Sequence, residues 1–358
     1  MNLDDLQAIA ELDADHMLDR IAELPDQCRA AWQQTEKLAF PPRYAGIEHL
    51  VIVGMGGSAI GGTLLQGLVS DACGVSITIV RDYSLPAFVA GPECLVVACS
   101  YSGNTEETIA SFQQALSRDA RAVAITTGGK LNELAREAGV PVVQFSYQSQ
   151  PRAALGYAFI LLLGTVHRLG LVLDYTEDVT EASAVMEAWQ EEIGVEVPTA
   201  HNAAKQLAGQ IAGQTPVVYG AGFLAAAANR WKTQFNENAK NWAFFDRLPE
   251  LNHNAVVGLG IPDVARDHNA VVMLRSELDP ERIAERWEVT GELLAREGVT
   301  VEEVWGRGRS KLSQMLSLIH FGDFVSFYVA MLNGVDPTPV ENIAFLKRRL
   351  AELGKIAK

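Results

Sequence analysis

The sequence predicts an α/β protein made of parallel sheets flanked by helices, with additional helices at both ends of the chain. Short β-branched runs alternate with helical segments, and a strand followed by a Gly-x-Gly turn and a helix occurs once in each half. Parallel strands need a long return connection, which the intervening helices provide. A chain of 358 residues with 48% hydrophobic residues has enough material for about two domains.

The first half is expected to begin with a helix and to continue into a sheet. Apolar residues recur at helical spacing over residues 8–32, and Pro41-Pro42 ends that pattern. Strands are predicted at residues 49–53, 75–80, 95–99, 122–126 and 140–145. Helices are predicted at 153–170 and 176–190, with a connection at 195–199.

The same pattern begins again in the second half. A strand is predicted at 216–219, a turn at 220–222 (GAG) and a long helix at 223–241, followed by strands at 255–258, 270–274 and 299–305. Helices are expected at 312–332 and 340–353. Because both halves begin alike, we infer two similar subdomains, at 45–195 and 196–358, after a helical lead-in at 1–44.

Composition excludes several classes of partner. Against 29 Lys and Arg stand 44 Asp and Glu, a net charge of −15 that repels nucleic acid and anionic membranes. Cys28, Cys73, Cys94 and Cys99 have no CxxC spacing, which disfavours a zinc site and a disulfide framework. The N-terminus lacks the features of a signal peptide, and the apolar run 153–166 is short for a bilayer. We therefore expect a cytoplasmic protein.

A glycine-rich loop at residues 54–62 (GMGGSAIGG) follows the first strand. Glycines let the backbone approach a ligand, and the amides at a helix start can bind an anion. The same residues fit the GxGxxA pattern of a dinucleotide site, with Asp82 near the end of the next strand, and they also fit a turn that binds nothing. The loop alone leaves these alternatives open.

A second loop, residues 100–108 (SYSGNTEET), follows another predicted strand. The hydroxyls of Ser100, Ser102 and Thr105, with helix-start amides, suit the three terminal oxygens of a phosphate monoester. Alternatively, Ser102 or Asn104 caps the helix and Glu107 completes a capping box. The position of this loop beside the glycine loop favours phosphate binding. A dinucleotide-binding fold has no need of these hydroxyls.

Three further residues are candidates for chemistry. Arg152 begins an apolar helix, where it either neutralises an oxyanion or pairs with a surface carboxylate. Glu237 lies in a helix and His253 in a loop between asparagines; each alone is more often structural, but together they supply a proton acceptor and a proton shuttle near neutral pH. No HExxH motif or repeated histidine spacing points to a metal site.

Together these motifs resemble the bifunctional phosphoglucose/phosphomannose isomerases, sugar isomerase (SIS) domain proteins of the phosphoglucose isomerase superfamily. The resemblance extends from about residue 45 to 353 and rests on both loops and on segments 150–152 (QPR), 236–238 (NEN) and 252–254 (NHN). It implies two SIS subdomains in a homodimer with active sites at the subunit interface. It also implies glucose, mannose and fructose 6-phosphates as substrates, and neither a cofactor nor a metal.

The resemblance further implies a role for each candidate residue. Glu237 is the base that moves the proton between C2 and C1, and His253, from the neighbouring subunit, opens the sugar ring. Arg152 and Lys347 stabilise the enediolate, and Thr338 is a candidate for the hydroxyl residue that turns the intermediate in relatives with dual activity. The residues implied to hold the phosphate are Gly56, Gly57, Ser58, Ser100, Ser102 and Thr105.

Three other functions remain open at this point. A non-catalytic SIS module that senses a sugar phosphate would keep both loops but has no need for Glu237 and His253. An amino-sugar isomerase or transferase is a second alternative, although a glutamine-dependent synthase would need an N-terminal cysteine nucleophile. A dehydrogenase is the third, and it requires that a nicotinamide cofactor binds.

Overall fold

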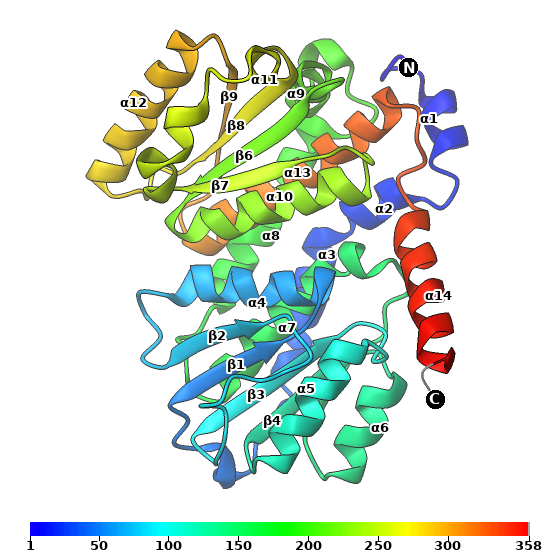
Figure 1. Ribbon diagram of the computed structural model, residues 1–358, viewed down its shortest axis with the longest axis vertical. Coiled ribbons are helices and arrows are strands. Elements are labelled where there is room, and N and C mark those ends of the chain that lie inside the picture. The colour runs from blue at the N-terminus through cyan, green and yellow to red at the C-terminus, as the bar shows by residue number, and fades with distance from the viewer. Residues whose placement is uncertain (357–358) are drawn as a thin grey trace.

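Two parallel sheets, one in each half of the chain, lie in the upper and lower parts of the molecule, with helices between them (Figure 1). This computed structural model describes residues 1–356, apart from the side chains of Ala265 and residues 354–356. The first sheet has the order β2-β1-β3-β4-β5 and the second the order β7-β6-β8-β9, and the pairing is parallel throughout both. The predicted fold class is confirmed.

The strands of the first sheet are β1 (His49–Val53), β2 (Ser76–Val80), β3 (Cys94–Ser100), β4 (Arg121–Thr126) and β5 (Val142–Gln144). Those of the second sheet are β6 (Thr215–Ala221), β7 (Phe244–Leu248), β8 (Asn269–Arg275) and β9 (Thr300–Trp305). Helices flank both sheets (Figure 1).

The α-helices of the first half are α1 (Leu6–Leu12), α2 (Met17–Ala22), α3 (Leu24–Thr35), α4 (Gly56–Val69), α5 (Glu106–Ser117), α6 (Gly129–Glu137), α7 (Leu155–Arg168) and α8 (Thr176–Ile193). Those of the second half are α9 (Ala203–Ile211), α10 (Ala225–Glu237), α11 (Asp263–His268), α12 (Glu281–Arg296), α13 (Lys311–Leu332) and α14 (Glu341–Ile356). Short 3-10 helices are η1 (Pro42–Tyr44), η2 (Pro151–Ala153), η3 (Thr199–His201), η4 (Gly222–Leu224), η5 (Glu250–His253) and η6 (Ala255–Gly258).

The two halves repeat one topology, as inferred. Strands β6, β7, β8 and β9 occupy the places that β1, β2, β3 and β4 occupy in the first sheet. The turn after the first strand is also the same: Met55 and Ala221 share a φ of −128°, and the following Gly56 and Gly222 share a φ of +49°. Glycine adopts this left-handed conformation without the strain that a Cβ would cause.

Several boundaries differ from the predictions. The region predicted as one lead-in helix contains three helices, α1 to α3. Between α1 and α2, the buried Asp13 carboxylate accepts hydrogen bonds from the amides of Met17 and Leu18. The long helix predicted to reach residue 241 ends at Glu237, since Lys240 adopts a φ of +54° that no α-helix continues through. Helices α9 and α12 were not predicted.

One predicted strand is wrong and one real strand was not predicted. Residues 255–258 form η6, where Val257 is exposed on the surface instead of lying in the sheet. The strand next to β6 is instead β7, an edge strand whose Asp246 and Arg247 interrupt the apolar pattern. Exposed edge strands carry polar residues, so a search for apolar runs overlooks them.

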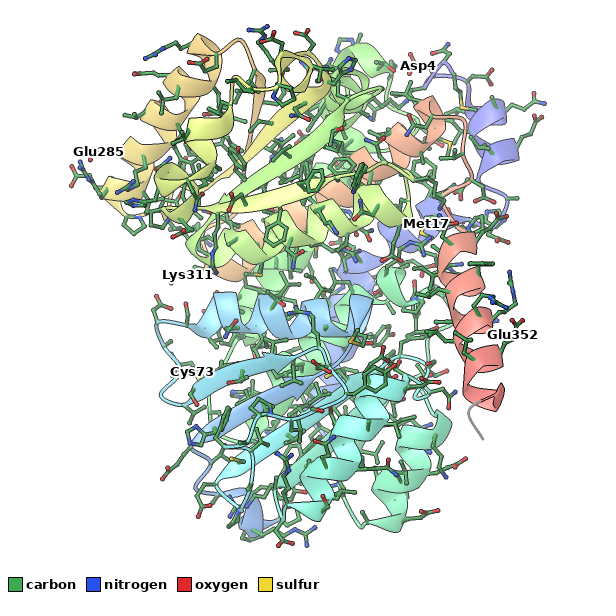
Figure 2. All side chains as sticks on the ribbon, in the orientation of Figure 1. Asp4, Met17, Cys73, Glu285, Lys311 and Glu352 are labelled. Atoms are coloured by element: carbon green, nitrogen blue, oxygen red, sulfur yellow. The ribbon has the colours of Figure 1, made fainter. Side chains whose placement is uncertain are left out.

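Two apolar helices join the halves into one core. Helix α13 is buried over nearly its whole length and packs against α8, α9 and α10, and α7 packs against α3 and α4. The segment Lys311–Asn333 is long and apolar enough to cross a membrane, but 94% of its most apolar window is buried inside the protein, which is typical of a core helix. Lys311, labelled in Figure 2, forms an ion pair with Asp71 across the two halves.

Candidate active site

The glycine-rich loop brings the first sheet against η2. A Cβ on Gly54 would lie 2.9 Å from the Cys99 carbonyl oxygen, and one on Gly57 would lie 3.0 Å from the Pro151 carbonyl oxygen. Any side chain at these two positions would push the neighbouring backbone away. The glycines therefore let the start of α4 pack directly against the segment that carries Arg152.

The hydroxyl-rich loop is tied to the glycine loop. Ser58 Oγ accepts a hydrogen bond of 3.1 Å from the Tyr101 amide, and Ser100 Oγ lies 3.0 Å from Thr105 Oγ1. Ser100 Oγ also accepts from the Gly103 amide at 3.1 Å. These contacts gather hydroxyls at the carboxyl ends of β1 and β3, where ligands of open α/β sheets bind.

The capping alternative for this loop is wrong in its details. Neither Ser102 nor Asn104 is the N-cap of α5; that position belongs to Thr105, whose side chain makes no capping hydrogen bond to the helix. Ser102 Oγ accepts from the Asn104 amide at 3.2 Å and remains exposed at the loop tip. The first amides of α5 thus have no side-chain acceptor from the N-cap residue, which suits an anion.

Arg152 is buried, with 3% of its side chain exposed, and is held by several acceptors. Its Nε donates to Asn238 Oδ1 at 2.7 Å, and one Nη donates to the carbonyl oxygens of Pro337 and Thr338 at 2.7 and 2.9 Å. Burial lowers the pKa of Arg152, and the Glu237 carboxylate opposes that effect. A buried guanidinium that keeps one Nη for the partly exposed Glu237 carboxylate is consistent with an ion pair and with the neutralisation of an oxyanion.

The other Nη of Arg152 faces Glu237, the last residue of α10. The distance from this nitrogen to Glu237 Oε2 is 3.6 Å, and the Glu237 side chain is 27% exposed. The Glu237 carboxylate is therefore accessible to a ligand, while its Oε2 faces the buried guanidinium of Arg152. The structure thus brings Glu237 and Arg152 together, and Gly57 connects them to the phosphate-binding candidates.

A buried ion pair supports Arg152 from beneath. Arg230 donates to Asp323 Oδ2 and to the Arg152 carbonyl oxygen, both at 2.8 Å. Both side chains lie in the core, and burial raises the pKa of Asp323 while Arg230 opposes that shift. A paired charge of this kind fixes the backbone of Arg152, because breaking the pair would leave a buried charge alone.

His253 and Lys347 lie apart from this group. His253 is exposed in η5, and Lys347 is exposed on α14, which runs along the margin of the molecule (Figure 1). Within residues 1–356, no hydrogen bond or ion pair joins either of them to Glu237 or Arg152. The structure therefore shows a contact between Glu237 and Arg152 but, within the described residues, no bond that ties His253 or Lys347 to them.

Two more residues lie near Arg152: Lys240, which was not assigned from the sequence, and Thr338, which was a candidate for the residue that turns the intermediate. Lys240 donates from Nζ to the carbonyl oxygens of Glu237 and Pro337, at 2.6 and 2.9 Å. Thr338 is 6% exposed, and its Oγ1 has no hydrogen-bond partner within the described chain. Lysine three residues after the predicted base was the available signal for Lys240, but spacing alone does not show which carbonyl groups it reaches.

Comparison with known proteins identifies the family. Residues 200–350 match the model of the bacterial phospho-glucose isomerase C-terminal SIS domain. A bifunctional phosphoglucose/phosphomannose isomerase from Caldicellulosiruptor bescii is 40% identical, over 94% of this chain and 99% of that protein. This chain belongs to the bifunctional phosphoglucose/phosphomannose isomerase family. Another such isomerase, from Aquifex aeolicus, is 36% identical over 89% of this chain and 94% of that protein.

Solved structures agree with this phosphoglucose/phosphomannose isomerase fold. A tagatose-6-phosphate ketose/aldose isomerase from Escherichia coli superposes with a TM-score of 0.69 at 15% identity, covering 92% of this chain and 97% of that one. At this identity the likeness shows the fold alone. The expected membership of the isomerase family is confirmed, whereas the role of each site residue stays a prediction.

Proposed function

We propose that this chain interconverts glucose 6-phosphate and mannose 6-phosphate with fructose 6-phosphate, as an aldose-ketose isomerase. The observation that carries this proposal is the buried Arg152 guanidinium 3.6 Å from the partly exposed Glu237 carboxylate, beside the two hydroxyl-bearing loops. A sensor of sugar phosphates would need the loops but not an acid and a cation fixed beside them.

The phosphate would bind between the two loops. Gly56 and Gly57 leave room at the start of α4, and Ser58, Ser100, Ser102 and Thr105 supply hydroxyl donors. Each hydroxyl can turn its proton toward an oxygen of the phosphate, and the amides that begin α4 and α5 add to the attraction. This binding acts far from the reacting carbons, so its energy orients C1 and C2 toward Glu237.

Glu237 would remove the proton from C2 and return it to C1 through an enediolate. Positioned proton transfer contributes about 10²- to 10⁴-fold to the rate. The free Nη of Arg152 faces the same carboxylate and would stabilise the charge that develops on the substrate oxygens. No metal takes part in this proposed mechanism.

Both aldoses would give the same enediol, so the site must let the C2–C3 bond rotate before the proton returns. Thr338 is the residue proposed to assist this rotation. Its carbonyl oxygen accepts from Arg152, and its buried Oγ1 is without a partner, which leaves one hydroxyl available beside the site. A buried hydroxyl that lacks a hydrogen bond is costly unless a ligand supplies one.

We further propose that the functional unit is a homodimer whose active sites use His253 and Lys347 across the interface. Helix α14 supports this: Ile343, Leu346, Leu350 and Leu353 are all exposed and recur at the spacing of a helix-packing seam. In the segments on either side of His253, the side chains of Trp242, Phe244, Phe245, Val257 and Ile261 are also exposed. Exposed apolar patches of this kind mark interfaces.

Two smaller proposals accompany this assembly. The limits 45–195 and 196–358 for the SIS subdomains place one sheet in each. A cytoplasmic location fits the four cysteines, which are free in the structure and would stay reduced there.

A coupled assay tests the function. Purified, chelator-treated protein is given glucose 6-phosphate or mannose 6-phosphate, and the formation of fructose 6-phosphate is followed. With glucosamine 6-phosphate, the loss of the amino-sugar phosphate itself is followed, because its isomerisation does not release fructose 6-phosphate. Conversion of the first two supports the proposal, and conversion of glucose 6-phosphate alone restricts it to one sugar. Binding without conversion would favour the sensor, and conversion of the amino sugar alone would favour the amino-sugar alternative.

Subunit mixing tests the shared active site. Coexpressed Glu237→Gln and His253→Ala chains are each expected to be inactive, but a mixed dimer restores one complete site if the two residues come from different subunits. Random pairing would then recover about a quarter of the wild-type activity in a symmetric dimer. No recovery from verified mixed dimers would place both residues in one subunit.

A further inference from the structure

Lys240 occupies the junction between three parts of the candidate site. Its Nζ donates to the carbonyl oxygen of Glu237 at 2.6 Å and to that of Pro337 at 2.9 Å. The Pro337 carbonyl also accepts from Arg152 at 2.7 Å. The lysine ammonium group therefore links the end of α10 to the segment after α13, and the Pro337 carbonyl links that segment to the guanidinium from η2.

The backbone of Lys240 is strained, which sets this lysine apart from an ordinary surface residue. Its φ of +54° lies in the left-handed region, which glycine and asparagine occupy more easily than lysine. Non-glycine residues in this region cluster at functional sites, where the surrounding contacts hold them in place. The conformation turns the chain sharply after α10 and directs the side chain back toward its end.

We propose that Lys240 is a positioning residue of the isomerase. By donating to the carbonyl oxygens of both Glu237 and Pro337, it holds the base and the Thr338 segment in fixed positions around Arg152. This inference rests on the isomerase function proposed above. Lys240 acts through the backbone of Glu237, because the structure shows its ammonium group bonded to the carbonyl oxygen and to no carboxylate oxygen within the described chain.

Charge gives this arrangement a pH dependence. The charged groups that face Lys240 are Arg152 from η2, Glu237 from α10 and Asp336 from the segment after α13. Burial lowers the pKa of Lys240 to about 8, and Arg152 contributes in the same direction. Above that pH the ammonium group loses its proton, so its hydrogen bonds to the two carbonyl oxygens become weaker.

Three variants at this position separate positioning from stability. Lys240→Met removes the donors and keeps the length, Lys240→Asn removes them but tolerates the left-handed backbone, and Lys240→Arg keeps charge and donors. Misplacing a catalytic group by about 1 Å can cost 10²-fold, so we expect kcat to fall about 10- to 100-fold in the first two. KM should change much less, because the phosphate loops are untouched. Lys232→Met, on α10 just before this turn, is the control.

The pH profile and the Tm complete the test. Wild-type kcat should decline above about pH 8, and Lys240→Arg should recover most of the kcat and move this decline to higher pH. Lys240→Asn should keep a near wild-type Tm because it relieves the strained backbone. Full kcat in Met and Asn variants, or a loss that only follows the folded fraction, would overturn the inference. An inactive wild-type protein would instead refute the proposed function.

Discussion

Replacing Glu237 by Gln separates catalysis from stability more cleanly than any other single change. The amide has the shape of the carboxyl group but does not accept the C2 proton. Loss of a positioned base predicts a decrease in kcat of about 10²- to 10⁴-fold, equivalent to about 2.7–5.5 kcal/mol of activation free energy. Substrate binding should stay near its wild-type strength, because the phosphate loops hold most of the ligand.

The structure predicts a much smaller effect of this substitution on folding. The ion pair with Arg152 spans 3.6 Å and has one partner that is 27% exposed, so it contributes about 1 kcal/mol or less. Arg152 also keeps its hydrogen bonds to Asn238, Pro337 and Thr338. The Tm should therefore change by about 2 °C or less in a chain of this size.

The assay measures kcat with both aldoses, substrate affinity by calorimetry and the Tm, for Glu237→Gln and for the control Glu191→Gln on the exposed face of α8. The control should match the wild type in all three. The reasoning is refuted if Glu237→Gln keeps a kcat within about threefold of the wild type, or if its lost activity is matched by lost folded protein.

Three further variants give separate expectations. The double variant Ser102→Ala, Thr105→Ala should raise KM at least tenfold, since each hydrogen bond to a charged group contributes about 1.5–3 kcal/mol; a lower Tm with an unchanged KM would mean that these side chains only stabilise the loop. His253→Ala should reduce turnover of the closed sugar more than that of an open-chain substrate, and equal losses in steady-state rates would contradict ring opening. Asp323→Ala should lower the free energy of unfolding by about 3–5 kcal/mol in urea titrations, because Arg230 is left buried without its partner, and a change under 1 kcal/mol would show that the pair is not needed.

The sequence was sufficient for those elements whose burial leaves a clear pattern. Strands β1, β3 and β8 are almost wholly buried and read as continuous apolar runs, and α13 is apolar on every side because it lies in the core between the halves. The edge strand β7 is half-exposed and contains polar residues, so its apolar content did not predict a strand. Segment η6 is apolar but exposes Val257, so its apolar content predicted a strand that is not there. Pattern analysis therefore succeeded where solvent was excluded and failed at β7 and η6, although it found the edge strands β2, β5 and β9.

For the candidate site, motif position made Ser58, Ser100 and Arg152 candidates but did not show how they are held. Local spacing correctly placed the loops at strand ends, where a parallel sheet brings them together. The contacts of Arg152 with Asn238 and Pro337 join residues far apart in sequence, and no local pattern encodes such contacts. Lys240 was missed for the same reason, since its hydrogen bond to Pro337 depends on the fold of the whole second half.

The repeated topology raises the question of why only one half carries hydroxyl-bearing phosphate loops. The matching turns align Gly56 with Gly222 and so align Ser58 with Leu224, which is buried and has no hydroxyl. The strand registers in turn align Ser100 with Arg275, at the end of β8.

Arg275 is already committed to structural contacts. It forms ion pairs with Glu288 and Glu303 at 2.7 and 2.5 Å and stacks on the ring of Trp305. The second half therefore has neither the hydroxyl nor a free cation at the places where the first half would hold a phosphate. Its contribution is instead Glu237, at the end of the helix that follows its own glycine turn. Under the proposed function the two repeats would divide the work, since one would bind the phosphate and the other would supply the base, and Arg152 contacts both where they meet.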